Sequence, residues 1–321
     1  MAMNRFVIVL LAAVANAMSL APGAKVLVVG NGPIQCLAAR LCAIKGYTTT
    51  LAVIGTTMST DEQVVYDNDG EGQYTKDKLP LTIMPITGEN VDEKAIETCI
   101  AEAEGMIFAF DSSDRTLPEL SMNVFLPQEG GTAIKSVSLM SRYCNGGGMG
   151  FTVNAAKIAA NPDLWAGGKM IPEYKKMESM INARTKALNA GCTVIRAGNL
   201  KGGSTGDQAG GGGGDPRFLN PFFYTLGQQD IVNWRLLYDC NALGVEVSAG
   251  DTLPGSGFTA ALTATDRIGQ GDSHRGAVAT ALVEALGCEP AKDKDFSIKT
   301  TEAREFDSST ATWEKLFTSA K

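Results

Sequence analysis

The chain has 321 residues, of which 44% are hydrophobic and 20% are charged, so it is long enough to bury one large core. Its formal net charge of -7, with no cluster of lysine or arginine, excludes the electrostatic footprint of a nucleic-acid-binding protein. Because His274 is the single histidine, we expect no metal site, and a Ser-His-Asp hydrolase is disfavoured.

The first 17 residues have the organisation of a secretory signal peptide. Arg5 supplies a short basic region, residues 6–15 form an apolar run, and Ala15-Asn16-Ala17 is a small-residue cleavage site. The run is too short to span a bilayer stably, and no later segment is long and apolar enough to do so. We therefore predict no stable membrane span, with a membrane anchor or a disordered start as the alternative.

The seven cysteines are scattered and form no CxxC pair, which favours buried, reduced thiols over a disulfide framework. Reduced thiols are unusual behind a signal peptide, because the secretory route is oxidising. Import into a plastid through that route reconciles the two, and residues 15–22 are similar to the signal/transit junction of algae with complex plastids. The alternative location is the secretory pathway, or secretion.

The folded part of the chain opens with a strand, a glycine loop and a helix. Residues 25–29 (KVLVV) are apolar without alternation, which is typical of a parallel strand buried on both faces. Residues 33–45 have a helical apolar stripe and begin with Pro33, which suits the first position of a helix. A second strand is predicted at residues 48–54, which completes one βαβ unit.

The alternation of strands and helices continues along the chain. Further strands are predicted at residues 81–86, 106–110, 136–140 and 192–196, and helices at residues 91–104 and 169–189. This order predicts an α/β fold with a doubly wound, mostly parallel, Rossmann-like sheet.

The C-terminal third begins with a glycine-rich stretch at residues 202–215, which is either a mobile surface insertion or a lid over a ligand. Helices at residues 220–242, 275–286 and 312–318 and a short strand at residues 296–298 then form a small C-terminal α/β extension. We expect residues 25–200 to form the core, and residues 201–321 to form a substrate or capping part of the same domain.

The sequence Gly30-Asn31-Gly32-Pro33-Ile34-Gln35 lies between the first strand and the first helix. The first glycine permits a tight turn, and the second lets the backbone approach a diphosphate, whose charge the helix N-terminus favours. The third position of this pattern, usually small, is Gln35. We predict a dinucleotide site on these residues, from Gly30 to Ile34; the alternative is a tight turn that binds nothing.

The end of the second strand normally distinguishes NAD from NADP, through an acidic or a basic residue. Here the sequence is Gly55-Thr56-Thr57, which has neither. The hydroxyl of Thr56, Thr57 or Ser59 can bond the ribose of either cofactor, so the choice between NADP and NAD stays open. The missing acidic residue also disfavours FAD and a flavoprotein.

Five stretches in this order resemble the atypical short-chain dehydrogenase/reductase family, near its NmrA-like members. They include VLVVGNGPIQCLAARLCAIKGY at residues 26–47 and MESMINARTKALNAGCTVIRAGNL at residues 177–200; the others are at residues 86–110, 134–141 and 272–286. The resemblance implies a carbonyl-orienting serine at Ser141. It also implies cofactor contacts beside the adenine ribose and near the nicotinamide, at Phe110, Asp111, Ser112, Arg196 and Gly198.

The family's Tyr-x-x-x-Lys pair, in which tyrosine is the general acid, is incomplete here. Tyr174 is the candidate tyrosine, but the residue four positions later is Glu178. Lys175, next to Tyr174, could replace that lysine only by a shift in helical register, because it points about 100° away around a helix. Tyr143 is a second candidate, and Lys157 is its only conceivable partner. The resemblance therefore implies a degenerate or relocated dyad.

Two other patterns invite a functional interpretation. The glycines at residues 146–150 suggest a flexible active-site loop, or an anion-binding nest. At the start of the helix near residue 275, we expect Asp272 or Ser273 to be the cap and His274 to lie on the surface, with an acid/base role as the alternative. The aromatic residues at 218–224 are interpreted as core, or as the floor of a substrate pocket.

Two functions remain. The favoured one is an NAD(P)-binding protein with a redox-sensing or assembly role and no standard chemistry. The alternative is an active NAD(P)H-dependent reductase of a carbonyl or activated double bond. The sequence predicts a dinucleotide as ligand, together with an unknown small molecule or protein partner.

Overall fold

The computed structural model describes residues 20–54, 65–66, 75–86, 92–110, 117–128, 132–143, 170–198, 200–201, 217, 243–252, 273–301 and 303–321. Four predicted features lie outside these residues: the signal peptide, the glycine cluster at 146–150, the glycine-rich stretch at 202–215 and the helix at 220–242. The aromatic residues at 218–224 lie outside them too.

An eight-stranded sheet forms the centre of the protein, in the order β3-β2-β1-β4-β5-β6-β10-β8. Every neighbouring pair is parallel except β8–β10, which is antiparallel. The strands are β1 (Lys25–Asn31), β2 (Thr48–Ile54), β3 (Leu81–Ile86), β4 (Gly105–Phe110), β5 (Ser136–Arg142), β6 (Gly191–Ala197), β8 (Gly244–Ala249) and β10 (Lys294–Thr301). This confirms the predicted α/β, mostly parallel Rossmann-like sheet.

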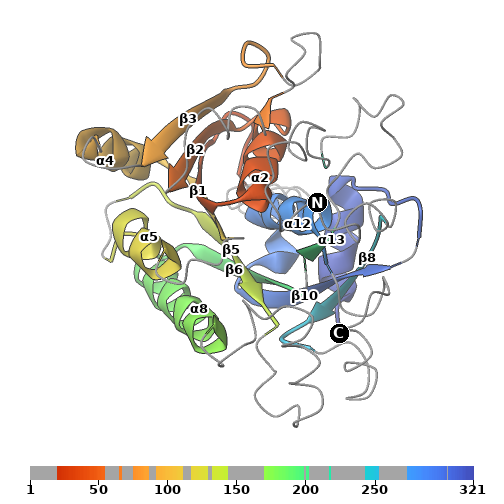
Figure 1. Cartoon of the computed structure of the whole chain (residues 1–321). Helices are drawn as coiled ribbons and strands as arrows, with labels where there is room; N and C mark the ends of the chain where they lie inside the picture. The colour runs from red at the N-terminus through yellow and green to blue at the C-terminus, as the bar shows by residue number, and fades with distance from the viewer. Residues whose placement is uncertain are drawn as a thin grey trace, which may run out of the picture.

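Helices cover both faces of this sheet (Figure 1). One face carries α2 (Pro33–Ile44), α12 (Arg275–Gly287) and α13 (Thr310–Ser319). The opposite face carries α4 (Glu93–Glu102), α5 (Leu117–Phe125) and α8 (Met170–Ala187). A short parallel pair, β7 (Leu200–Lys201) with β9 (Ser273–His274), and a 3₁₀ turn at Glu289–Ala291 complete the described elements.

Alternate residues of the central strands enter two separate cores. In β1, Val26 and Val28 pack on the α2 face, whereas Leu27 and Val29 pack on the α8 face. All six residues of β4 are buried, because the sheet is covered on both sides. The continuous apolar runs in the sequence are therefore explained by their central position.

Some elements differ from the sequence-based prediction. The elements β7, β8, β9 and α5 were not predicted; β8 is an edge strand of six residues, of which Gly244 and Val247 are buried. The predicted helix at residues 275–286 is present as α12, but it lacks the exposed face of a surface helix, because it is buried on all sides through Leu286. α12 lies between the sheet, α2 and α13, so it presents no face to water.

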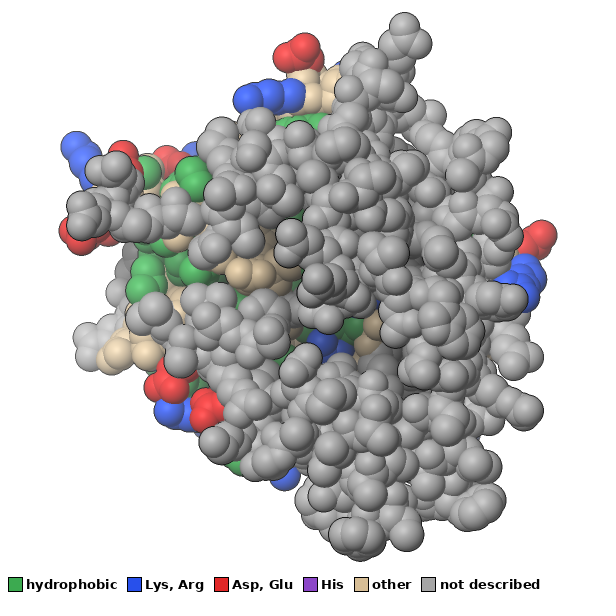
Figure 2. All heavy atoms as spheres, in the orientation of Figure 1, with side chains coloured by type: hydrophobic (Ala, Val, Ile, Leu, Met, Phe, Trp, Pro, Cys, Tyr) green, Lys and Arg blue, Asp and Glu red, His purple; other side chains and the backbone are tan. Residues whose placement is uncertain are grey.

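Four of the five cysteines in the described segments are buried, and all five are free thiols, as predicted. Desolvation by burial raises the pKa of Cys192 to about 12, so this thiol stays protonated and unreactive at neutral pH. Within the described segments, none of the helices has both the length and the apolar character needed to cross a membrane. In the space-filling view, acidic and basic side chains lie together at the margin of the visible face (Figure 2).

Candidate dinucleotide site

The carboxyl ends of β1 and β4 form the point at which the order of strands reverses. From β1 the chain moves outward through β2 and β3, and then returns to the other side of β1 as β4. In open α/β sheets, ligands bind in the crevice at such a point. The predicted phosphate loop, Gly30-Asn31-Gly32-Pro33, lies here between β1 and α2.

The two glycines of this loop are required for different reasons. A Cβ at Gly30 would lie 1.8 Å from the carbonyl oxygen of Ala109, so the close approach of β1 and β4 demands glycine. Gly32 has φ 108° and ψ -174°, a conformation that is open essentially to glycine alone. This backbone conformation leads from β1 into the first turn of α2.

The N-cap residue of α2 is Gly32, which has no side chain with which to cap the helix, and Pro33 occupies the first turn. Its first backbone N–H groups have no partner within the helix, and they carry the positive end of the helix dipole. An uncapped N-terminus at the strand-order reversal is suited to an anionic group that supplies the missing acceptors.

The side chains of the loop point away from it, toward β2. Asn31 donates from Nδ2 to the carbonyl of Ile54 (2.8 Å), and the buried Gln35 donates from Nε2 to the carbonyl of Ala52 (3.1 Å). Gln35 thus fills the helix–strand contact that usually requires a small residue, and it does not bond the loop. Its Oε1 has no hydrogen-bond partner in the described part of the chain.

The neighbouring strand ends are only partly described. Phe110 is buried at the end of β4, in register with Asn31. Thr56, Asp111 and Ser112 lie outside the described residues. Their proposed contacts with ribose, and the choice between NADP and NAD, stay predictions.

A polar cluster lies on the α8 face of β5 and β6; we call its members, Ser141, Glu178, Arg196 and Asp295, the Arg196 cluster. The hydroxyl of Ser141 donates to Oε1 of Glu178 at 2.5 Å. Arg196 donates to Glu178 through Nε (2.9 Å) and Nη2 (2.8 Å), and its Nη1 donates to Asp295. The bidentate pair fixes the guanidinium and the carboxylate in one plane.

The Arg196 cluster is largely removed from water. The exposed side-chain fractions are 9% for Arg196 and 14% for Glu178, whereas Asp295 is 45% exposed. Burial alone would lower the pKa of Arg196, but its hydrogen bonds with Glu178 and Asp295 raise that pKa above the ordinary value. The guanidinium therefore remains a fixed cation held by two carboxylates.

The tyrosine candidates lie apart from this arrangement. Tyr174 is buried in the α8 core, one helical turn before Glu178, while Lys175 is exposed on another side of the helix. Tyr143 is buried, and its hydroxyl donates to the carbonyl of Ile298 at 2.5 Å. Lys157 lies outside the described residues. The structure thus joins Ser141 and Arg196 through Glu178, and it places no described lysine in that position.

Glu178 is the site residue that the sequence analysis missed as a functional partner. In the sequence, Glu178 is the residue that interrupts the Tyr-x-x-x-Lys spacing. The available signal was a carboxylate four residues after a buried tyrosine, on a helix preceding the strand that carries Arg196. Asp295 gave no such signal, because β10 is almost 100 residues farther along the chain.

Gly198 and the start of α12 adjoin the carboxyl end of β6. The N–H of Gly198 donates to the hydroxyl of Ser273 (2.8 Å), and its carbonyl accepts from Nη1 of Arg142 (2.7 Å). Ser273 in turn donates to the carbonyl of Ile298 (2.6 Å). Through Ser273, these bonds hold Gly198, the residue that follows β6, close to β10.

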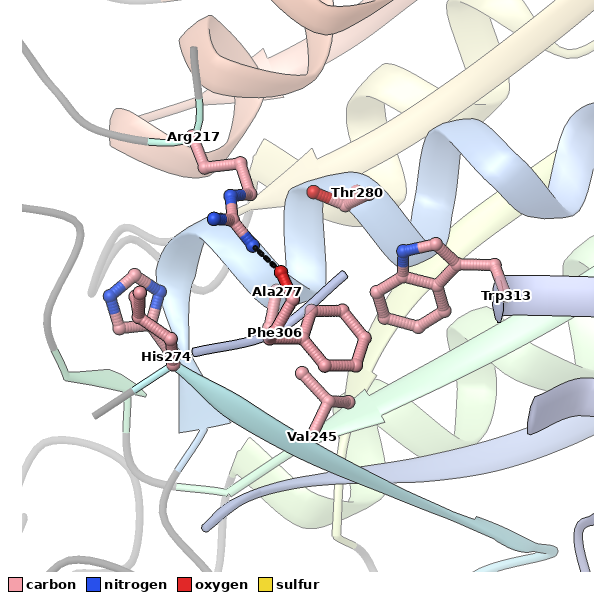
Figure 3. Close-up of a pocket in the computed structure, with 8 residues that line it drawn as sticks. Arg217, Val245, His274, Ala277, Thr280, Phe306 and Trp313 are labelled. Carbon is pink, nitrogen blue, oxygen red and sulfur yellow. Dashed lines mark hydrogen bonds between the residues drawn. The ribbon is translucent and has the colours of Figure 1, made fainter. Parts of the chain in front are cut away.

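The expected cap of α12 is wrong. The N-cap is His274, whose Nδ1 accepts the N–H of Gly276 at 3.1 Å, and the side chain of Ser273 bonds β10 instead. His274 is also only 4% exposed, so it is not a surface residue, and it lines a small pocket of about 10 Å³ (Figure 3). A larger pocket of about 170 Å³ lies at the amino ends of β5 and β6, near Ser136 and Cys288.

Tyr143→Phe is expected to destabilise the protein by about 1 kcal/mol, the value of one buried hydrogen bond. The loss stays small because the carbonyl of Ile298 keeps its bond from Ser273. Urea denaturation measures the change, with Tyr174→Phe as the comparison. A weaker affinity for cofactor at unchanged stability would instead place the Tyr143 hydroxyl in the binding site.

No protein-family model and no curated protein sequence matches this chain. Solved structures with a similar arrangement include an NAD-dependent epimerase/dehydratase from Bacillus halodurans, at 13% identity and a TM-score of 0.45, covering 91% of this chain and 99% of that one. Another is Gre2 from Candida albicans in complex with NADPH, at 12% identity and a TM-score of 0.47, covering 86% of this chain and 78% of that one.

A third is a short-chain dehydrogenase/reductase of the wide type from Veillonella parvula in complex with NADP. It has 12% identity and a TM-score of 0.42, and the match covers 88% of this chain and 97% of that one.

Proposed function

We propose that this chain binds NADP or NAD, with the diphosphate on residues 30–33 and on the first turn of α2. The observation that carries this proposal is the conformation of Gly32. With φ 108° it connects β1 to α2 at the strand-order reversal, and as the N-cap residue it has no side chain to cap the helix. A turn that served only to connect β1 and α2 could have a capping side chain at the N-cap, where this chain has Gly32.

The residues around the loop fit a dinucleotide in chemistry as well as position. The bare backbone of Gly30 and Gly32 admits a diphosphate, while Asn31 and Gln35 turn their side chains toward β2 and leave the loop clear. We assign Thr56 to one ribose, and Phe110, Asp111 and Ser112 to the adenine side. Arg196 and Gly198 belong to the nicotinamide side in this proposal. A bound nicotinamide would supply hydride transfer.

Within that proposal, we favour binding without standard reductase chemistry, as in an NmrA-like protein with a redox-sensing or assembly role. The Arg196 cluster supports this view, because the proton of Ser141 is donated to Glu178 and is not available to a substrate carbonyl. The hydroxyl of Tyr143 is likewise donated to Ile298. The mature chain is proposed to act in a plastid, reached through the signal peptide; secretion is the alternative.

Protein lacking residues 1–17 is expected to bind NADPH or NADH saturably, measured by titration of the cofactor's fluorescence. Gly32→Ala should weaken that affinity at least about tenfold. A residue with a side chain at this φ is strained by about 1–3 kcal/mol, so the turn must change its conformation to relieve the strain. The matched control is Gly23→Ala, which has φ 85°, no atom within 4 Å of the new Cβ, and a position away from the loop. If neither cofactor binds at millimolar concentration, the proposal is wrong in both its forms.

The reductase alternative has its own test. The protein with bound cofactor is assayed against a panel of carbonyl and activated double-bond substrates. Turnover that falls in Tyr174→Phe or Tyr143→Phe, with cofactor affinity unchanged, would establish a proton donor and replace the non-catalytic proposal.

A further inference from the structure

The start of α12 depends on the single imidazole of this chain. His274 is the N-cap residue, with extended backbone (φ -71°, ψ 131°), and its Nδ1 accepts the N–H of Gly276 at 3.1 Å. Its own backbone N–H donates to the hydroxyl of Thr300 at 2.6 Å. The residue therefore ties the first turn of α12 to β10 through one side-chain bond and one backbone bond.

Accepting a hydrogen bond at Nδ1 requires a lone pair on that nitrogen. A neutral imidazole with its proton on Nε2 has such a lone pair, whereas an imidazolium carries hydrogens on both nitrogens and accepts nothing. Protonation of His274 and capping of α12 by its side chain are thus mutually exclusive. Serine, threonine, asparagine and ionised aspartate, the usual caps, impose no such condition near neutral pH.

The N-terminus of α12 also opposes a cation at His274, because it carries the positive end of the helix dipole. Among the described residues that line the pocket of His274, the charged one is Arg217, which lies at the same end of the pocket as the imidazole in Figure 3. Arg275 follows His274 on α12 and is buried.

We propose that His274 makes the junction of β9 and α12 a pH-sensitive latch, which is closed while the imidazole is neutral and opens when it is protonated. The latch holds the two-residue pair β7–β9, whose partners are Leu200 with Ser273 and Lys201 with His274. It lies at the carboxyl edge of the sheet, beside the segment that follows β6. This inference does not depend on whether a dinucleotide binds.

The sign of the effect follows from linkage. In the unfolded chain the imidazole has its ordinary pKa of about 6.5, so below that pH the unfolded state binds a proton that the latched state refuses. Stability is therefore complete above about pH 6.5 and falls as the pH decreases. Over the range in which only the unfolded state is protonated, the folding equilibrium constant falls about tenfold per pH unit.

The experiment compares the full-length protein with His274→Asn, whose side-chain oxygen caps a helix without titrating in this range. Urea denaturation at pH 7.5 and pH 5.5 should show a folding constant about tenfold lower at pH 5.5 in the protein and nearly equal values in the variant. Free carboxyl groups titrate near pH 4, so they contribute little in this window. Because the chain has one histidine, ¹⁵N NMR reads the tautomer and titration of His274 without assignment ambiguity.

The expected NMR result is a neutral imidazole protonated on Nε2 at pH 7, with a titration midpoint below that of free histidine. An Nδ1-protonated tautomer, or a midpoint above about 6.5, would overturn the proposal, as would the same pH dependence in His274→Asn. If that variant does not fold, the tautomer and midpoint in the unaltered protein decide the question alone.

Discussion

Arg196→Met is expected to destabilise the protein by about 3–5 kcal/mol, the usual loss when one partner of a buried ion pair is removed. The substitution keeps the bulk of the side chain but leaves the carboxylate of Glu178, 14% exposed, with the Ser141 hydroxyl as its remaining described bond. Glu178→Gln should cost less, because the amide keeps an acceptor for Arg196 and Asp295 still neutralises the guanidinium. Urea denaturation at neutral pH measures both changes.

Asp295→Asn is the matched control for the Arg196 cluster. Its side chain is 45% exposed, so its ion pair with Arg196 is screened by water and should contribute about 1 kcal/mol or less. A loss as large as that of Arg196→Met would show that both carboxylates are needed to hold the guanidinium. Equal, small losses in all three variants would contradict a structural role for the cluster.

Gly30→Ala is expected to cost at least about 3 kcal/mol, at the upper end of the range for overpacked cores. The new Cβ would lie 1.8 Å from the carbonyl oxygen of Ala109, and neither atom can move away because both belong to the backbone of paired strands. The variant should lose much of its stability or fail to accumulate as folded protein. Thermal unfolding by circular dichroism and soluble yield measure this result.

Gly287→Ala is the control for this change. The nearest atom to its new Cβ is the hydroxyl of Tyr47 at 3.5 Å, an ordinary contact, and the residue is the last of α12. Alanine there should change stability by about 1 kcal/mol or less, in the stabilising direction, because it restricts the unfolded chain. A stable Gly30→Ala variant would mean that β1 and β4 are farther apart than described.

The central strands were predictable from sequence because they are covered on both faces. Burial of whole strands such as β4 produces continuous apolar runs, and the glycine loop and Pro33 mark the start of α2. β8 escaped prediction for the opposite reason: it is a short edge strand, half exposed, whose pairing with β10 joins residues about 50 positions apart. α12 was found as a helix, but its burial on all sides depends on α13, which comes later in the chain.

The site divides in the same way. The loop from Gly30 to Pro33 is local, so its residue types alone indicated its place and its backbone. The Arg196 cluster joins β5, α8, β6 and β10. No local sequence pattern predicts the bond between Arg196 and Asp295, because the two residues are far apart in the chain. His274 was overlooked as a cap because aspartate and serine, which precede it, are commoner caps. In the structure the hydroxyl of Ser273 bonds β10 instead, which leaves the cap to His274.

One outer edge of the sheet has a consequence for behaviour at high concentration. β3 is the last strand on its side, and Pro85 lies within it, opposite Val53. Proline has no N–H to offer a further strand, so a second molecule cannot extend this sheet with an unbroken ladder. Replacing Pro85 by valine would restore that donor, and fibril formation on storage is the hazard that the native residue reduces.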